Sequence, residues 1–316
     1  MYGETDRQTK YSSAPQIDPP SALSLPAPTD DVAQAQEDMR DTGLCILTDV
    51  LDADHVERLK TKLDRQVAAE AALGTLTPAQ IKTDKQIVSN MVNKGADFLA
   101  LVERKETEAI AGHLLGRDFL LSSLTGHLFK GPTHEAQLIH RDQGQVPASA
   151  PFPALVNLFY LLDDFTPERG STLVVPGSHR WAPEHLIKPP PLEMAVQVSA
   201  PAGSLFAFEG RLWHGAGINQ TGHARRSISV FCSAPWLRQQ ENGGATYLQD
   251  VLDNASDTLK VRLGLKTYGT LGQMNGAIAA EEKVSFGSYE VRVPDYIIGE
   301  EGALHPLRRV RRGDTQ

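Results

Sequence analysis

The segment around which this sequence is organised reads Gln137-Leu138-Ile139-His140-Arg141-Asp142-Gln143. His140 and Asp142 are separated by one residue and follow a short apolar run typical of a strand or a strand end. Side chains at positions i and i+2 of a strand lie on the same face, so this imidazole and this carboxylate can converge on one point. Taken alone, such a tripeptide also fits an ordinary surface turn. A second histidine, His214, follows later in the chain within Trp213-His214-Gly215.

Short apolar runs separated by Gly, Pro and Asp surround this segment and predict its fold. Regularly spaced short strands with turns between them indicate a sandwich or barrel instead of a parallel α/β sheet. About eight strands fit a cupin-like jelly roll, the double-stranded β-helix. With the helices expected outside it, the fold class is mainly β with flanking helices (α+β). The predicted strands are 119–129, 136–140, 155–162, 172–175, 194–198, 204–208, 212–216 and 227–233.

Segments of other character precede and follow the predicted strands. Residues 1–30 are rich in Pro, Ser, Gln and Asp without apolar periodicity, and we expect a flexible N-terminal arm. Apolar residues at helical spacing predict a helix capped by Asp52 and another over 98–115. We therefore expect residues 31–240 to form the double-stranded β-helix domain with N-terminal helices. Residues 241–316 would be a C-terminal extension packed on the same domain.

Composition narrows the classes of partner. The 316 residues are 41% hydrophobic and 22% charged, as in ordinary globular proteins, and a formal net charge of −8 argues against a nucleic-acid partner. No apolar run is long enough to cross a membrane, and the first residues lack a secretion signal. Cys45 and Cys232 lie in apolar runs typical of buried thiols. We expect a cytoplasmic, soluble protein that acts on a small molecule, with a homo-oligomer left open.

Two imidazoles and one carboxylate at strand edges are the ligand set of the facial triad in non-haem Fe(II) oxygenases. Such a site leaves coordination positions open on the far side of the metal. A co-substrate such as 2-oxoglutarate chelates the metal through its 2-oxo acid end, and its distal carboxylate then needs a buried, bidentate arginine. Arg225 and Arg226 point to opposite faces of a predicted strand. We favour Arg225, which shares its face with Ser227 and Ser229, and keep Arg226 as the alternative.

The motifs taken together resemble the phytanoyl-CoA dioxygenase family of Fe(II)- and 2-oxoglutarate-dependent oxygenases, from about residue 43 to residue 237. One departure is Ser204, where many members have Asp in a turn. The motifs that carry the resemblance are, in order, the His-x-Asp segment, the acidic turn and Gly-x-Thr strand over 162–175 with Pro176-Gly177-Ser178-His179, and Gly203-Ser204-Leu205-Phe206-Ala207-Phe208 followed by Trp213-His214-Gly215-Ala216-Gly217-Ile218-Asn219 and Arg225.

The resemblance implies a role for each matching residue. His140, Asp142 and His214 would bind Fe(II), which would also require O2. Asp142 favours oxygenation, because halogenating relatives replace this carboxylate by a small residue. The residues implied in binding 2-oxoglutarate are Arg225 for the distal carboxylate, Gln137, Thr172, and Lys85 or Lys82 as the upstream basic residue.

These inferences lead to one expected function and two alternatives. The expected function is oxidation, most simply hydroxylation, of an unactivated C–H bond in a small hydrophobic natural-product or lipid-like substrate, with release of succinate and CO2. The cavity wall should come from 75–93, from the loop 143–152 and from the segment after Trp236. Within that loop, the Pro/Ala-rich, uncharged stretch 146–152 suggests a lid over an apolar substrate. A cupin-type metal-dependent isomerase or hydrolase would not need Arg225. A non-catalytic small-molecule-binding jelly roll would need no metal.

Overall fold

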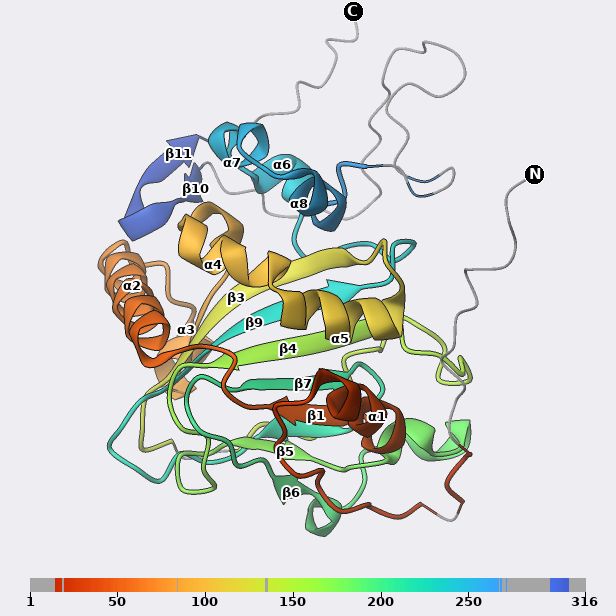
Figure 1. Ribbon diagram of the computed structural model, residues 1–316. Coiled ribbons are helices and arrows are strands. Elements are labelled where there is room, and N and C mark those ends of the chain that lie inside the picture. The colour runs from red at the N-terminus through yellow and green to blue at the C-terminus, as the bar shows by residue number, and fades with distance from the viewer. Residues whose placement is uncertain are drawn as a thin grey trace, which may run out of the picture.

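The computed structural model of the chain describes residues 15–18, 20–83, 85–133, 136–266, 268, 271 and 296–306. Two antiparallel sheets form its centre (Figure 1). The large sheet has the order β1-β7-β4-β9-β3-β2, with β1 (Leu44–Leu47), β2 (Lys85–Val88), β3 (Leu120–Phe129), β4 (Leu155–Leu161), β7 (Leu205–Glu209) and β9 (Arg225–Ser233). The small sheet has the order β6-β5-β8, with β5 (Thr172–Val174), β6 (Val196–Gln197) and β8 (His214–Ala216).

Helices cover one face of the large sheet, where α4 and α5 lie across the strands in Figure 1. The helices are α1 (Val32–Thr42), α2 (Ala53–Ala72), α3 (Pro78–Thr83), α4 (Ala96–Ala100), α5 (Lys105–Leu115), α6 (Gly243–Thr246), α7 (Gln249–Asp253) and α8 (Asp257–Arg262). Single 3-10 turns occur at η1 (Met91–Asn93), η2 (Leu101–Glu103), η3 (Ser178–Arg180), η4 (Pro183–Leu186), η5 (Leu192–Met194) and η6 (Glu300–Gly302). This arrangement confirms the predicted jelly-roll core with flanking helices.

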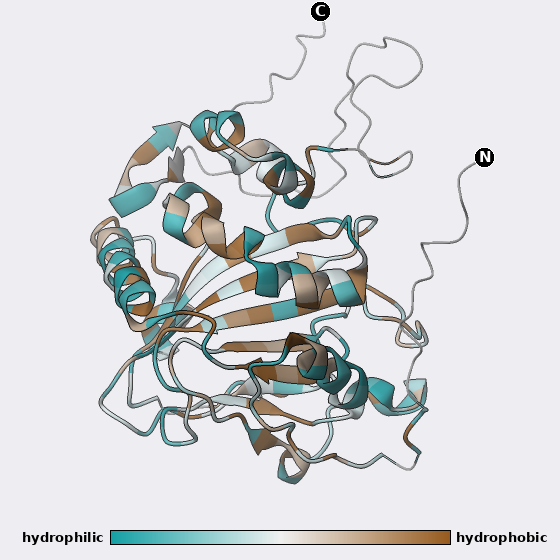
Figure 2. Cartoon of the chain, in the orientation of Figure 1, coloured by the Kyte–Doolittle hydropathy of each residue, from teal (hydrophilic) through white to brown (hydrophobic). Residues whose placement is uncertain are grey.

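The large sheet is buried on both faces, which explains why its strands are so apolar. Figure 2 shows hydrophobic residues along the central strands and hydrophilic residues along the outer turns of α2. A first cluster of buried side chains packs the sheet against the helices, and a second packs it against the small sheet. The second cluster includes Ile46, Phe206 and Val174. Phe165 and Phe208 of the second cluster also line a cavity on the inner face of the sheet, where a ligand can enter.

Local sequence signals explain where several elements begin and end. Asp52 caps α2 by accepting a hydrogen bond from the backbone N–H of His55 at 2.7 Å, as predicted. The predicted helix over 98–115 is wrong in its middle, because Arg104 has an extended backbone between η2 and α5. Its guanidinium donates hydrogen bonds to the Val50 carbonyl and to Glu106, which holds the break in place.

The predicted strand over 136–140 is also wrong in its extent. His140 forms an isolated antiparallel bridge with His214, and Gln137 donates its backbone N–H to the carbonyl of Ala216. These two contacts differ in register by one residue, so the ladder is interrupted between them. Leu138 lies in the interruption with its side chain 87% exposed. The segment therefore follows β8 as an irregular edge that still aligns the two histidines.

Both ends of the described chain lie against the core. In the predicted N-terminal arm, whose first 14 residues lie outside the described ranges, Leu23 and Thr29 donate backbone hydrogen bonds to the carbonyls of Pro176 and Ile46. Arg262 of α8 binds Glu108 and the carbonyl of Phe119. The hairpin of β10 (Tyr296–Ile298) and β11 (Leu304–Pro306) follows. Within the described ranges, no helix is long and apolar enough to cross a membrane.

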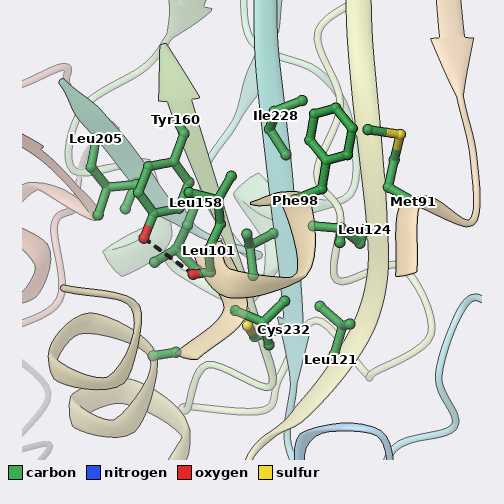
Figure 3. Close-up of a cluster of buried hydrophobic side chains, with 14 of the residues drawn as sticks. Met91, Phe98, Leu101, Leu121, Leu124, Leu158, Tyr160, Leu205, Ile228 and Cys232 are labelled. Carbon is green, nitrogen blue, oxygen red and sulfur yellow. Dashed lines mark hydrogen bonds between the residues drawn. The ribbon is translucent and has the colours of Figure 1, made fainter. Parts of the chain in front are cut away.

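A hydrogen-bonded triangle lies inside the apolar cluster shown in Figure 3. The hydroxyl of buried Tyr160 lies 2.7 Å from the Thr107 hydroxyl and 3.4 Å from the carbonyl of Leu101, and the Thr107 hydroxyl donates to the same carbonyl. We expect Tyr160→Phe to lower the free energy of unfolding by about 1–2 kcal/mol, the usual cost of one buried hydrogen bond. Chemical denaturation measures this change in the free energy of unfolding. Thr107→Val should show coupling to Tyr160→Phe, and strictly additive losses would contradict the triangle.

Candidate active site

Three predicted metal ligands come together at one end of the jelly roll. One donor atom from each of His140, Asp142 and His214 lies within 4.8 Å of the other two. The carboxylate oxygen Oδ1 of Asp142 is 3.7 Å from Nε2 of His140 and 3.6 Å from Nε2 of His214. Such spacing places two nitrogens and one oxygen around a common point. It fits a small divalent metal that keeps its remaining positions open.

The backbone fixes the orientation of both imidazoles. His140 and His214 exchange backbone hydrogen bonds, with N···O distances of 2.8 and 2.9 Å. In each ring, Nδ1 lies 2.9–3.0 Å from the carbonyl two residues earlier, of Leu138 and Leu212 respectively. A carbonyl can only accept, so each Nδ1 carries the proton and each Nε2 presents a lone pair toward Asp142. Burial also lowers the pKa of His214, which keeps this ring neutral and able to bind a metal.

A polar relay positions the carboxylate ligand. The amide Nδ2 of Asn157 on β4 donates to Oδ2 of Asp142 at 3.5 Å, and the hydroxyl of Ser229 on β9 donates to Oδ1 of Asn157 at 2.5 Å. Asp142 is thereby turned so that its other oxygen, Oδ1, points toward both histidines. Nothing in the sequence alone marked Asn157, because its partner Asp142 lies on a different segment.

This relay predicts a partial loss of Fe(II) affinity when Asn157 is replaced. We expect Asn157→Leu to weaken Fe(II) binding by about 10- to 100-fold, the usual effect of removing a group that orients a ligand. Titration of the apoprotein with Fe(II) under argon measures the effect. Thr125→Val is the matched control, because the Thr125 hydroxyl lies in the same cavity but contacts His127. Equal Fe(II) affinity in Asn157→Leu and wild type would refute the relay.

Arg225 lies on the inner face of β9, in the same cavity as the three ligands. It is 5% exposed, and its guanidinium lies between the rings of Phe129 and Phe165, 4.9 and 4.6 Å from their centroids. Its Nη1 has no hydrogen-bond partner among the described residues. Burial lowers the pKa of Arg225 to about 9, so it is still cationic at neutral pH. A buried cation with an unpartnered donor is costly unless an anion joins it, and this cavity can admit one.

Arg226, the alternative, points to the opposite face of β9. Its guanidinium binds Asp64 at 2.7 Å and Asp163 at 2.9 Å, and its backbone N–H also donates to Asp163. These carboxylates satisfy it outside the cavity. The structure thus places Arg225, and not Arg226, where a ligand can reach it.

The ligands and Arg225 share a cavity of about 820 Å³ on the inner face of the large sheet. Gln137, Thr172 and Lys85 also line it, whereas Lys82 is exposed on α3. Two of the three predicted wall segments contribute, through residues 79–89 and through Gln240 and Glu241. The sequence did not indicate the aromatic wall of Phe129, Phe159, Phe165 and Phe208. Alternation along β3, β4 and β7 could have placed Phe129, Phe159 and Phe208 on one face each, but it does not show that these faces meet in one cavity.

The predicted lid is wrong: the loop 146–152 does not line this cavity. The side chain of Gln143 donates to the carbonyl of Phe152 and accepts from the backbone N–H of Ala154, which ties the loop down. Residues 148–151 instead line a second, smaller cavity of about 280 Å³. Composition alone gave no information about this hydrogen-bonded anchor.

A jelly roll with two histidines and one carboxylate beside a cavity, and a buried arginine in that same cavity, has the layout of a 2-oxo acid-dependent iron oxygenase. The sequence profile described as Phytanoyl-CoA dioxygenase (PhyH) matches residues 39–227. The chain belongs to this family and is an Fe(II)- and 2-oxoglutarate-dependent dioxygenase that uses O2. Membership confirms the predicted enzyme class and its cofactors.

Individual relatives agree with the family match. The protein is 28% identical to Dioxygenase af480 of Aspergillus fumigatus over 248 residues, covering 74% of this chain and 77% of that one. It is 31% identical to the uncharacterized protein Rv1501 of Mycobacterium tuberculosis over 221 residues, covering 66% and 77%.

Solved structures share the fold. The epimerase SnoN, solved with Fe3+, alpha ketoglutarate and nogalamycin RO, has a TM-score of 0.53 at 22% identity, covering 72% of this chain and 93% of SnoN. The apoform of EctD from S. alaskensis has a TM-score of 0.55 at 21% identity, covering 70% and 84%.

Proposed function

We propose that the protein hydroxylates an unactivated C–H bond of a small natural-product or lipid-like molecule with an apolar body. One oxygen atom of O2 would enter the substrate as a hydroxyl group. The other would enter succinate as 2-oxoglutarate loses CO2. The observation that carries this proposal is one cavity that holds both the His140, Asp142 and His214 group and the unpartnered guanidinium of Arg225.

Each cavity residue has a proposed task. His140, Asp142 and His214 would hold Fe(II), which supplies the activation of O2 when bound. Arg225 would donate two parallel hydrogen bonds to the distal carboxylate of 2-oxoglutarate, which would give its buried Nη1 a partner. Gln137 and Thr172, which line the same cavity, would hydrogen-bond the co-substrate, and Lys85 would add positive charge beside the ring of Phe129.

The aromatic wall supports an apolar substrate body and the exclusion of water. The wall residues Phe159 and Phe208 pack on each other and on the buried ring of Phe206, with centroid distances of 5.3–6.4 Å. Phe208 also packs on His214, with ring centroids 4.3 Å apart. A C–H bond held against this wall would lie beside the metal ligands. The wall also shields the site, which strengthens every electrostatic contact inside it.

Arg225 separates this proposal from a cupin-type isomerase or hydrolase. Those reactions need the metal ligands but no clamp for a second carboxylate. Succinate formation against a library of small molecules, followed by mass analysis of the product, tests the proposal. We expect one succinate for each product molecule and a product heavier than its substrate by one oxygen atom. Conversion of a substrate without succinate would favour the isomerase or hydrolase.

A further inference from the structure

The cavity has a second polar region, which lies away from Arg225. In the register of the large sheet, Ser123 on β3 and Asn157 on β4 both pair with Phe231 of β9. Ser123 is therefore two strands from Asn157, or about 10 Å at the usual strand spacing. Arg225 lies six residues from Phe231 along β9, or about 20 Å at the usual rise. Asn157, which contacts Asp142, is level with Ser123, so the second region lies across the sheet from the metal ligands and Arg225 lies farther along β9.

The segment that follows β9 builds this second region. A register shift in β3 between Leu121 and Ser123 frees the polar groups of Ser122 from the ladder. Ser122 accepts the backbone N–H of Gln240 through its hydroxyl and that of Glu241 through its carbonyl. The hydroxyl of Ser123 then donates to Oε1 of Gln240 at 2.7 Å. These contacts fix Gln240 and Glu241 against the sheet, and both line the cavity.

Glu241 supplies an acceptor with spare capacity. Its Oε1 accepts the backbone N–H of Asn90 at 2.5 Å and its Oε2 accepts that of Leu124 at 3.2 Å. Among the described residues it forms no ion pair, because the nearby cation Lys94 binds Glu70 instead, and burial raises the pKa of the Glu241 carboxyl group. A carboxylate can accept about four hydrogen bonds, so it can take further donors. Gln240 adds a donor, because its Nε2 bonds to no described residue.

The two polar regions of the cavity differ in charge. Arg225 and Lys85 make one region cationic, which suits the dianion 2-oxoglutarate. The other region contains Glu241, with the neutral groups of Gln240 and Ser123 beside it. A second carboxylate placed there would be desolvated next to Glu241, whereas a hydroxyl or amine could donate to it. Ile87 and Phe231 line the same cavity and offer apolar surface.

We propose that Glu241 and Gln240 recognise a hydroxyl or amino group of the substrate, so that the substrate is an amphipathic alcohol or amine and not a carboxylate. Its apolar body would lie along the aromatic wall beside the metal ligands, with the polar group in the Glu241 region. This inference rests on the proposed function, because it assumes that 2-oxoglutarate occupies the Arg225 region.

Three compounds with one carbon skeleton test the preference directly: cyclohexylmethanol, cyclohexylmethylamine and cyclohexanecarboxylate. Their dissociation constants for the full chain loaded with Zn(II) and 2-oxoglutarate are measured by ligand-observed NMR. We expect the alcohol and the amine to bind about tenfold or more tightly than the carboxylate. Equal binding of the carboxylate, or no binding of any of the three, would overturn the inference.

Two variants locate the effect. Glu241→Gln keeps an oxygen for one backbone N–H and should remove most of the advantage of the amine. Gln240→Leu leaves the backbone contacts of the segment intact and should weaken binding of the alcohol. An unchanged order of affinities in both variants contradicts the assignment. Titration of 2-oxoglutarate into the Zn(II)-loaded proteins, before the three compounds are added, tells the two failures apart. If the wild type does not bind 2-oxoglutarate, the proposed function fails. If it binds 2-oxoglutarate but shows no preference among the three compounds, only the inference fails.

Discussion

Asp142→Ala is expected to abolish Fe(II) binding and 2-oxoglutarate turnover. Asp142 contributes the only carboxylate of the three-residue group, and its Oδ1 lies within 3.7 Å of both Nε2 atoms. Without it, two neutral imidazoles would have to hold a doubly charged ion. The affinity should fall by more than about 100-fold, beyond the 10- to 100-fold typical of groups that only orient a ligand.

The Fe(II) content after dialysis measures the loss of metal binding, and succinate formation in air measures the loss of 2-oxoglutarate turnover. Thr125→Val again serves as the control for a change in the same cavity. The folded state of each variant is checked by its thermal unfolding midpoint. If a folded Asp142→Ala protein bound one Fe(II) per chain and formed succinate at the wild-type rate, Asp142 would not be a metal ligand.

Arg225→Ala is expected to weaken 2-oxoglutarate binding far more than Arg226→Ala does. Removing one partner of a buried charge pair costs about 2–5 kcal/mol, which corresponds to about 30- to 5,000-fold in the dissociation constant. Arg226 faces Asp64 and Asp163 outside the cavity, so its removal should lower stability and leave the affinity for 2-oxoglutarate nearly unchanged.

Isothermal titration with 2-oxoglutarate in the presence of Zn(II) measures both variants. Arg225→Lys is informative as well, because lysine keeps the charge but loses the bidentate geometry. We expect its affinity to lie between those of the wild type and Arg225→Ala. A larger loss of 2-oxoglutarate affinity in Arg226→Ala than in Arg225→Ala would show that the carboxylate binds on the other face of β9.

The sequence was sufficient where a function depends on local spacing. His140 and Asp142 alternate along one segment, and Arg225 alternates with Ser227 and Ser229, so the face of each could be inferred from position alone. The apolar runs predicted the jelly roll for the same reason. Their partners in the sheets then followed the expected antiparallel arrangement.

The sequence was insufficient where a residue acts through a partner on another segment. Asn157 matters because it contacts Asp142, and Glu241 because it contacts Asn90 and Leu124. Packing between distant segments determines these pairs, and no periodicity encodes them. The prediction that the loop 146–152 forms a lid was wrong for the same reason, because the side chain of Gln143 anchors this loop through hydrogen bonds to Phe152 and Ala154.

The central claim is that the His140, Asp142 and His214 group and Arg225 form one site for Fe(II) and 2-oxoglutarate. Adding both to the apoprotein without oxygen and recording the visible spectrum tests it most directly. We predict a weak charge-transfer band from the chelate in the wild type, no band in Asp142→Ala, and a band that needs much more 2-oxoglutarate in Arg225→Ala. A folded, metal-loaded wild-type protein that shows no band at saturating 2-oxoglutarate would contradict the claim.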